Sequence, residues 1–174
     1  INEAANKFFT KHLFSTKGSF ALTYLRDRGL SLDIIKEFKI GLSPSKNGDL
    51  ISFLKEEGYT EKYIEKSGLA FKPENKPLVD RFKNRVMFPI CNLDDRVVAF
   101  GGRSINTSYG AKYINSAETK VFKKGSLLFN LNKAKKRNKN NSILIVEGFI
   151  DVISLANNKI NNVVAPLGTA LTKE

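Results

Sequence analysis

Two short apolar runs near the end of the chain, Ile143–Val146 and Val163–Ala165, constrain the fold strongly. The segment between them, about Phe149 to Asn157, is predicted as a helix. Strand, helix, strand is the unit of a parallel sheet, and an uninterrupted apolar run is typical of a strand buried on both faces. One such unit cannot bury itself, and the sequence stops at Glu174. We therefore expect a fragment whose sheet continues beyond these residues.

The residues before these runs predict a different organisation, in which short helices precede antiparallel strands. The helices are predicted at about 2–15, 19–28, 32–38, 49–57, 61–66 and 130–138, and the strands at 86–91, 96–100 and 112–114. Ser31 is suited to cap the third helix, and Gly29 to end the second. The expected fold is an α+β subdomain over residues 1–140, followed over 141–174 by the start of an α/β unit.

The charge of the chain is concentrated rather than spread evenly. The net charge is +12 over 174 residues, and residues 112–139 hold nine Lys/Arg against one Glu. A concentrated excess of this kind indicates a polyanionic partner, usually nucleic acid. A Lys/Asn-rich composition bias of the source is the alternative explanation.

Composition also excludes several classes of protein and site. One cysteine, Cys91, rules out a disulfide framework and a zinc site built on paired thiolates, and fits a reducing compartment. The first residues show no export signal, and no apolar run is long enough for a membrane helix. We therefore expect a cytosolic protein that has no membrane partner.

Two carboxylates follow the first apolar run directly. Glu147 stands at its carboxyl end, where open α/β sheets bind ligands, and Asp151 lies one helical turn later. Both can face one crevice, and two such oxygens suit Mg²⁺ together with substrate phosphates. Two carboxylates are too few for a two-metal site. The alternative is an exposed loop glutamate and an aspartate favoured by the helix dipole.

Several cations are candidates for phosphate binding. Gly101 and Gly102 allow a turn with positive φ and a close approach of the backbone, which would present Arg103 to a ligand. Lys112 and Asn115 can act together only if their strand ends near Asn115. Lys124 lies at a turn. An ordinary turn carrying a solvated arginine is the alternative for Arg103, and the basic helix at 130–138 is interpreted as a solvated face.

A series of motifs, taken in order, resembles the catalytic core of bacterial DnaG-type DNA primases over nearly the whole chain. The motifs are Tyr24–Gly29, Arg81–Ile90, Phe100–Arg103, Lys112–Ser116, Phe122–Gly125, Val146–Val152 and Pro166–Thr172. Each motif alone is weak, and the ordered series is highly specific.

The resemblance implies that a mixed α/β subdomain precedes the opening of a Toprim domain. It also implies synthesis of short RNA primers from nucleoside triphosphates on a single-stranded DNA template, at replication forks near the nucleoid. Glu147 matches the family's Toprim glutamate, which acts at the metal site and in acid/base chemistry, and Asp151 matches its acidic companion. The positions that match nucleotide and template contacts are Arg28, Arg81, Arg103, Lys112, Asn115 and Lys124.

The same resemblance implies parts that these 174 residues do not contain. The complete enzyme uses Mg²⁺ or Mn²⁺, and the family's later acidic residues lie beyond Glu174. Zinc belongs to a separate N-terminal module, and the replicative helicase binds a C-terminal region. We therefore expect this chain to bind DNA but to be catalytically incomplete.

Two other functions stay open from the sequence. The chain could be a non-catalytic module that binds single-stranded nucleic acid, although many of its 13 phenylalanines lie at core spacing rather than along a groove. It could also belong to another Toprim enzyme, a topoisomerase or a nuclease. That alternative explains Glu147 and Asp151 but not the motifs between Arg81 and Lys124.

Overall fold

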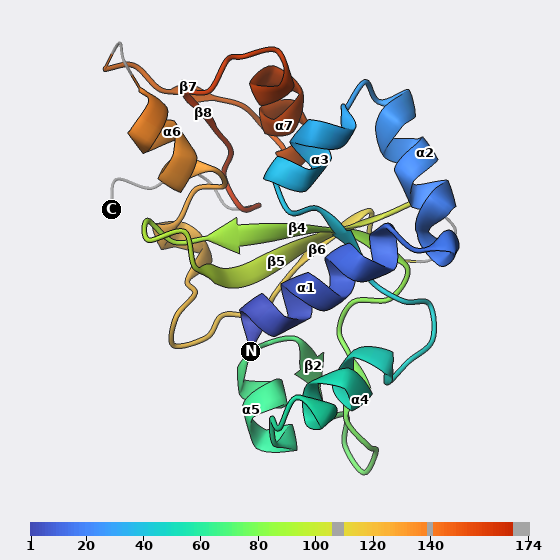
Figure 1. Cartoon of the computed structure of the whole chain (residues 1–174). Helices are drawn as coiled ribbons and strands as arrows, with labels where there is room; N and C mark the ends of the chain where they lie inside the picture. Colours follow the sequence, from blue (N-terminus) through green and yellow to red (C-terminus); the bar gives the residue numbers. More distant parts are fainter. Residues whose placement is uncertain (106–109, 139–140, 169–174) are drawn as a thin grey trace.

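The computed structural model describes residues 1–105, 110–138 and 141–168 (Figure 1). In these residues five α-helices precede the long strands of a small sheet and two follow them. The α-helices are α1 (Asn2–Leu13), α2 (Ser19–Asp27), α3 (Leu32–Glu37), α4 (Asp49–Glu56), α5 (Glu61–Lys66), α6 (Leu131–Arg137) and α7 (Phe149–Asn157). Two short 3₁₀ turns, η1 (Thr16–Gly18) and η2 (Lys124–Ser126), join longer elements.

A four-stranded antiparallel sheet forms the centre of the structure. Its order is β1 (Gly41–Leu42), β4 (Arg85–Cys91), β5 (Val97–Ser104) and β6 (Tyr113–Asn115). A separate two-stranded pair, β2 (Ala70–Phe71) and β3 (Val79–Asp80), lies beside the small helices. The expected order of helices and then antiparallel strands is therefore confirmed.

The central sheet is buried on both faces and divides the interior into two cores. Along β4, Val86, Phe88 and Ile90 belong to one core, and Met87 belongs to the other. This alternation is the two-residue period of a strand. Figure 1 shows α1, α4 and α5 on one side of the sheet, and α3 and α7 on the other. The second side carries the candidate functional residues described below.

The end of the described chain forms a short parallel pair, as predicted. β7 (Leu144–Ile145) pairs in parallel with β8 (Val163–Val164), and α7 connects them. The prediction that this first run is buried on both faces is wrong, because Leu144 is 43% exposed and Ile145 is 49% exposed. Among the described residues β7 pairs only with β8, so hydrogen bonding gives it one neighbour.

The basic helix α6 is held to the body of the protein by ion pairs. Glu37 of α3 accepts hydrogen bonds from Lys133 Nζ at 3.3 Å and from Arg137 Nη1 at 2.9 Å. Lys136 pairs with Asp95. Lys133 Nζ also lies 3.9 Å from the centre of the Phe38 ring. Much of the charge of this helix is therefore neutralised within the molecule.

The Glu37 pairs predict an acid dependence of stability. Burial raises the pKa of Glu37, but Lys133 and Arg137 outweigh burial, and the net shift is downward. A lowered folded-state pKa stabilises the protein above the unfolded-state pKa, and this stabilisation is lost as the pH falls through the folded-state value. Because the pair is about one-third exposed, we expect Glu37→Gln to cost about 0.5–1 kcal/mol at pH 7. Urea unfolding should show no such difference at pH values below the folded-state pKa.

A matched control for this prediction is Glu56→Gln, an exposed position on α4. An equal loss of stability in both variants would contradict the assignment to the α3–α6 ion pairs.

None of the helices in the described part of the chain has the length and apolar character needed to cross a membrane.

Candidate functional site

A cleft of about 400 Å³ lies where α2, the β5–β6 edge of the sheet and the start of α7 meet. We call it the main cleft. Its lining combines three cations with two carboxylates. The lining residues are Arg28, Arg103, Lys112, Tyr113, Glu147, Gly148, Ile150 and Asp151.

The acidic side of the main cleft is formed by the turn between β7 and α7. Glu147 follows β7, Gly148 is extended at the start of α7, and Asp151 lies in the first helical turn. Both carboxylates are exposed. A Cβ added to Gly148 would lie 3.3 Å from Asp151 Oδ2, so the aspartate folds back over the glycine. The predicted acidic pair therefore lines one cleft.

The basic side of the main cleft depends on pairing between β5 and β6. Arg103 and Tyr113 are register partners, and Arg103 Nη1 donates a hydrogen bond to Tyr113 Oη. The guanidinium carbon of Arg103 lies 5.1 Å from the Tyr113 ring centre and 5.7 Å from the Tyr24 ring centre. Arg28 lies 4.7 Å from the same Tyr24 ring. The two tyrosines therefore orient both arginines, a role that the sequence did not reveal.

Arg103 retains an unused donor although it is buried. Arg103 is 9% exposed, and its side-chain Nε has no hydrogen-bond partner in the structure. Leaving a buried charged donor unsatisfied is costly. Burial raises the pKa of Tyr113, and the positive charge and hydrogen bond of Arg103 reduce this shift only in part. At neutral pH the tyrosine hydroxyl therefore keeps its proton.

Lys112 is positioned by a buried arginine that sequence analysis missed. Arg85 is 8% exposed, and its Nη1 donates to the carbonyl oxygens of Ala111 at 2.9 Å and Gly102 at 3.3 Å. The amide of Ser104 donates to the carbonyl oxygen of Lys112 at 2.9 Å. These bonds fix the backbone before β6. Arg85 lies within the Arg81–Ile90 motif, but nothing in that motif distinguishes a buried arginine from a ligand-binding one.

The paired glycines act differently from the prediction. Gly101 and Gly102 lie inside β5 and have no positive φ, so the predicted glycine turn is wrong. The predicted close approach does occur, because a Cβ on Gly101 would lie 2.5 Å from ring atoms of Phe149. The strand continues past the glycines because β6 pairs with it. Gly101 thus makes room for the aromatic residue that follows Glu147-Gly148.

Two hydrogen-bonded contacts fasten the walls of the main cleft. Asn115 Nδ2 donates to the carbonyl oxygen of Leu167 at 2.7 Å, which joins β6 to the segment after β8. Asn157 at the end of α7 accepts a hydrogen bond from Ser31 Oγ at 2.7 Å. Its Nδ2 donates to the carbonyl oxygen of Gly29 at 3.3 Å. The predicted motif residues Thr169–Thr172 lie outside the described residues.

Three of the predicted site residues do not line the main cleft. The Nε of Arg81 donates to the carbonyl oxygen of Asn115 at 3.0 Å, so these two residues adjoin. β6 ends at Asn115, as joint action with Lys112 requires, but only Lys112 lines the cleft. Lys124 begins η2, where its amide donates to Glu118 Oε1 at 3.0 Å.

The donor set of the main cleft fits a hard divalent cation in part. In the described part of the chain, no group of three or more His, Cys, Asp or Glu side chains could hold a metal ion. Glu147 and Asp151 supply carboxylate oxygens only, which are the ligands that Mg²⁺ prefers. Mg²⁺ also uses substrate phosphates and water, so two carboxylates in an open cleft suit it.

Comparison with protein families matches the chain in two adjacent stretches. Residues 8–135 match the DNA primase catalytic core, N-terminal domain, and residues 141–174 match the Toprim domain. The DNA primase of Clostridium acetobutylicum is 45% identical over 174 residues, and that of Listeria monocytogenes is 40% identical over 176 residues. All of this chain is covered in both comparisons. It spans only 28% of the length of either relative.

Solved structures give the same result. The RNA polymerase domain of Mycobacterium tuberculosis primase DnaG, in complex with a double-stranded DNA oligomer with a 6-nucleotide overhang, is 31% identical. That likeness has a TM-score of 0.93 and covers 99% of this chain and 55% of the other. A DnaG primase catalytic domain bound to ssDNA is 37% identical, with a TM-score of 0.88, over 98% of this chain and 53% of the other.

Proposed function

Because this chain belongs to the family of DnaG-type DNA primases, we propose that it is part of an enzyme that synthesises short RNA primers on single-stranded DNA. The observation that supports this proposal most is the main cleft, which sets Arg28, Arg103 and Lys112 beside Glu147 and Asp151. Phosphoryl transfer requires cations on the phosphates and carboxylates where metal ions act. The match over residues 8–135 does not fit a topoisomerase or a nuclease.

In this proposal, the basic side of the main cleft binds the phosphates of an incoming nucleoside triphosphate. Arg103 supports this role, because its side chain lines the main cleft and a guanidinium forms strong hydrogen bonds with phosphate oxygens. Arg28 is held over Tyr24, and Lys112 adds a point charge. The tyrosines restrict the arginine side chains before the ligand arrives, which lowers the entropy lost on binding.

Glu147 and Asp151 are the proposed catalytic carboxylates. Both would hold Mg²⁺ or Mn²⁺, which would neutralise phosphate charge when bound. Glu147 lies two residues before Phe149, whose ring packs on Gly101, and its side chain lines the main cleft. We propose that these 174 residues alone bind DNA without polymerising, because the described residues place only two carboxylates there.

We propose that the template strand runs past Arg81, Asn115 and Lys124, outside the main cleft. Arg81 uses its Nε for Asn115, and we assign its two terminal nitrogens to template phosphate. We also propose that the chain divides into two parts, residues 1–140 and residues 141–174. The complete enzyme would act at replication forks near the nucleoid, in the cytoplasm. It would carry a zinc module and a helicase-binding region elsewhere in its sequence.

The test of this function is binding to single-stranded DNA, measured by fluorescence anisotropy and titrated with salt. Steeply salt-dependent binding is expected, and Lys124→Ala should weaken it and lower the log–log salt slope by roughly 0.7. Lys62→Ala on the exposed face of α5 removes the same charge at a position that the proposed template path does not include. An unchanged slope in Lys124→Ala, or no binding at low salt, would reject the proposed function.

A further inference from the structure

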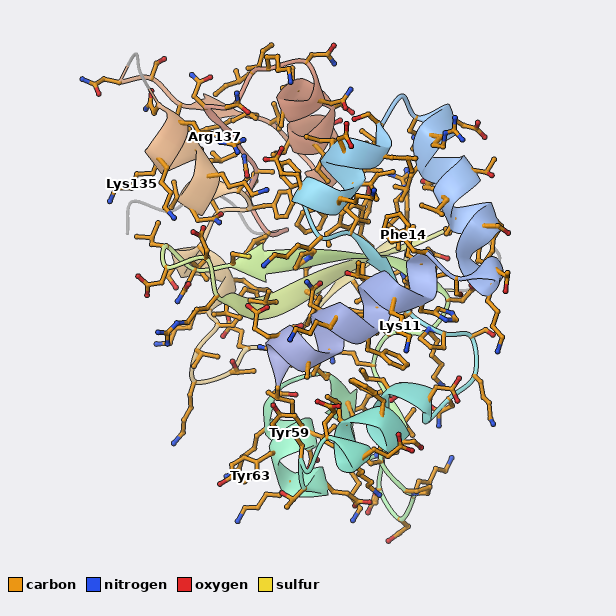
Figure 2. All side chains as sticks on the ribbon, in the orientation of Figure 1. Lys11, Phe14, Tyr59, Tyr63, Lys135 and Arg137 are labelled. Carbon is orange, nitrogen blue, oxygen red and sulfur yellow. The ribbon has the colours of Figure 1, made fainter. Side chains whose placement is uncertain are left out.

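A second cleft lies on the opposite side of the central sheet from α7. It has a volume of about 560 Å³ and is formed by α1, η1 and α4. It shares no residue with the main cleft. We call it the α1 cleft and define it by Lys7, Lys11, Lys17, Phe8, His12 and Phe53. Figure 2 shows Lys11 near the end of α1, on the side where α4 runs.

The lining of the α1 cleft carries a net positive charge. Lys7, Lys11 and Lys17 are exposed, and none of them forms an ion pair within the described residues. No carboxylate lines the cleft. On α6, by contrast, three of the four cations pair with Glu37 or Asp95. Lys7 and Lys11 are four residues apart, so they stand on one face, about 6 Å apart along the helix axis.

Two phenylalanine side chains line the α1 cleft. The Phe8 and Phe53 rings stack with centres 4.7 Å apart and an angle of 25° between their planes. Both side chains are only half-buried, so apolar ring surface is left in the cleft. Nucleobases stack on such rings, and each stacked base contributes about 1–3 kcal/mol.

Lysines beside an aromatic floor favour one class of ligand. Single strands without sequence preference are bound by a basic groove combined with aromatic surfaces. Carboxylates are matched best by the planar fork of arginine, whereas lysine binds phosphate as a point charge. The three cations of the α1 cleft are all lysines. Burial and Lys17 lower the pKa of His12, although Asp49 opposes this, so the imidazole is neutral at pH 7.

We propose that the α1 cleft is a second binding site for single-stranded nucleic acid, in which phosphates contact Lys7, Lys11 and Lys17 and a base lies on Phe8 and Phe53. This inference rests on the proposed function, because the strand that reaches it is the one held near the main cleft. The α1 cleft includes none of the proposed template residues Arg81, Asn115 and Lys124, so only a long strand can contact both places.

The test compares Lys7→Ala/Lys11→Ala with Lys62→Ala/Lys66→Ala. Each double variant removes two exposed lysines one turn apart, the first from α1 and the second from α5, so the net charge is matched. Anisotropy is measured with thymidine oligonucleotides of about 6 nucleotides, which is within the size of one typical single-strand site, and of about 20 nucleotides, which is longer than such a site. The α1 double variant should bind the long oligonucleotide roughly tenfold more weakly, with a salt slope lower by about 1.4. Its affinity for the short one should fall less than twofold.

Three outcomes would overturn the proposal, and they differ from failure of the proposed function. If the two double variants weaken DNA binding equally, the loss reflects the overall charge of the protein and not a site in the α1 cleft. If Lys124→Ala weakens binding and the α1 double variant does not, the proposed function stands and the α1 cleft does not bind DNA. If an acidic, aromatic-containing peptide binds through Lys7 and Lys11 while the long oligonucleotide does not, the ligand is a protein segment. A lack of binding by the unmodified chain would reject both proposals.

Discussion

Phe149→Ala is expected to lower the free energy of unfolding by about 3–5 kcal/mol, the range for truncating a buried phenylalanine. Phe149 is 6% exposed and stacks on Phe88 at 5.3 Å. It also meets the ring of Phe129 edge-to-face at 4.8 Å, and its ring lies over Gly101. Alanine would leave a cavity between the sheet and α7, and the surrounding rings cannot all move to fill it.

This prediction is checked by chemical denaturation beside the control Phe20→Ala. Phe20 is 46% exposed on α2, so its removal should cost less than about 1 kcal/mol. A loss of similar size in the two variants would show that the contact between Phe149 and the sheet does not hold α7. Because Glu147 and Asp151 flank Phe149, the variant should also weaken ligand binding in the main cleft.

Glu147→Gln is expected to lower the rate of primer synthesis by roughly 10²–10⁴-fold, the usual contribution of a general acid or base. The substitution keeps the shape of the side chain and removes the charge that would bind a metal ion or accept a proton. Glu147 is exposed, so folding should be unaffected. The assay uses the longest natural chain that carries these residues, because this segment covers 28% of its relatives.

The readout for Glu147→Gln separates a catalytic from a structural role. DNA affinity should stay within about twofold or rise, because a negative charge near phosphates has been removed. Glu65→Gln, at an exposed position on α5, should leave both rate and affinity unchanged. A rate within threefold of the parent protein would remove Glu147 from the proposed chemistry.

The fold followed from the sequence wherever local signals decide it. The helix prediction at 61–66 is confirmed, and that at 149–157 also matches. Gly29 has a φ of 78°, and Ser31 Oγ accepts the amide of Ile34, as the sequence predicted. β1, β2 and β3 were missed, because each has two residues and is defined only by its pairing, β1 with β4 and β2 with β3. A two-residue strand has no period to detect.

The main cleft was predicted in part. The spacing of Glu147 and Asp151 and the cations Arg103 and Lys112 were identified from sequence, and they line one cavity. The buried Arg85 was not identified from the sequence, because the burial of a residue depends on the whole fold. The α1 cleft was missed for another reason. Residues 1–80 are nearly balanced in charge, with 13 Lys/Arg against 11 Asp/Glu, and a regional sum conceals lysines gathered on one helix face.

The fastening of the main cleft has a consequence for how the protein can move. Asn115 ties β6 to Leu167, Asn157 ties α7 to the turn after α2, and Phe149 is seated on Gly101. A hinge motion requires that one element of the cleft move independently of the others. Here each element that forms the cleft is hydrogen-bonded to, or packed against, another. We therefore expect the width of the main cleft to change little when a ligand binds.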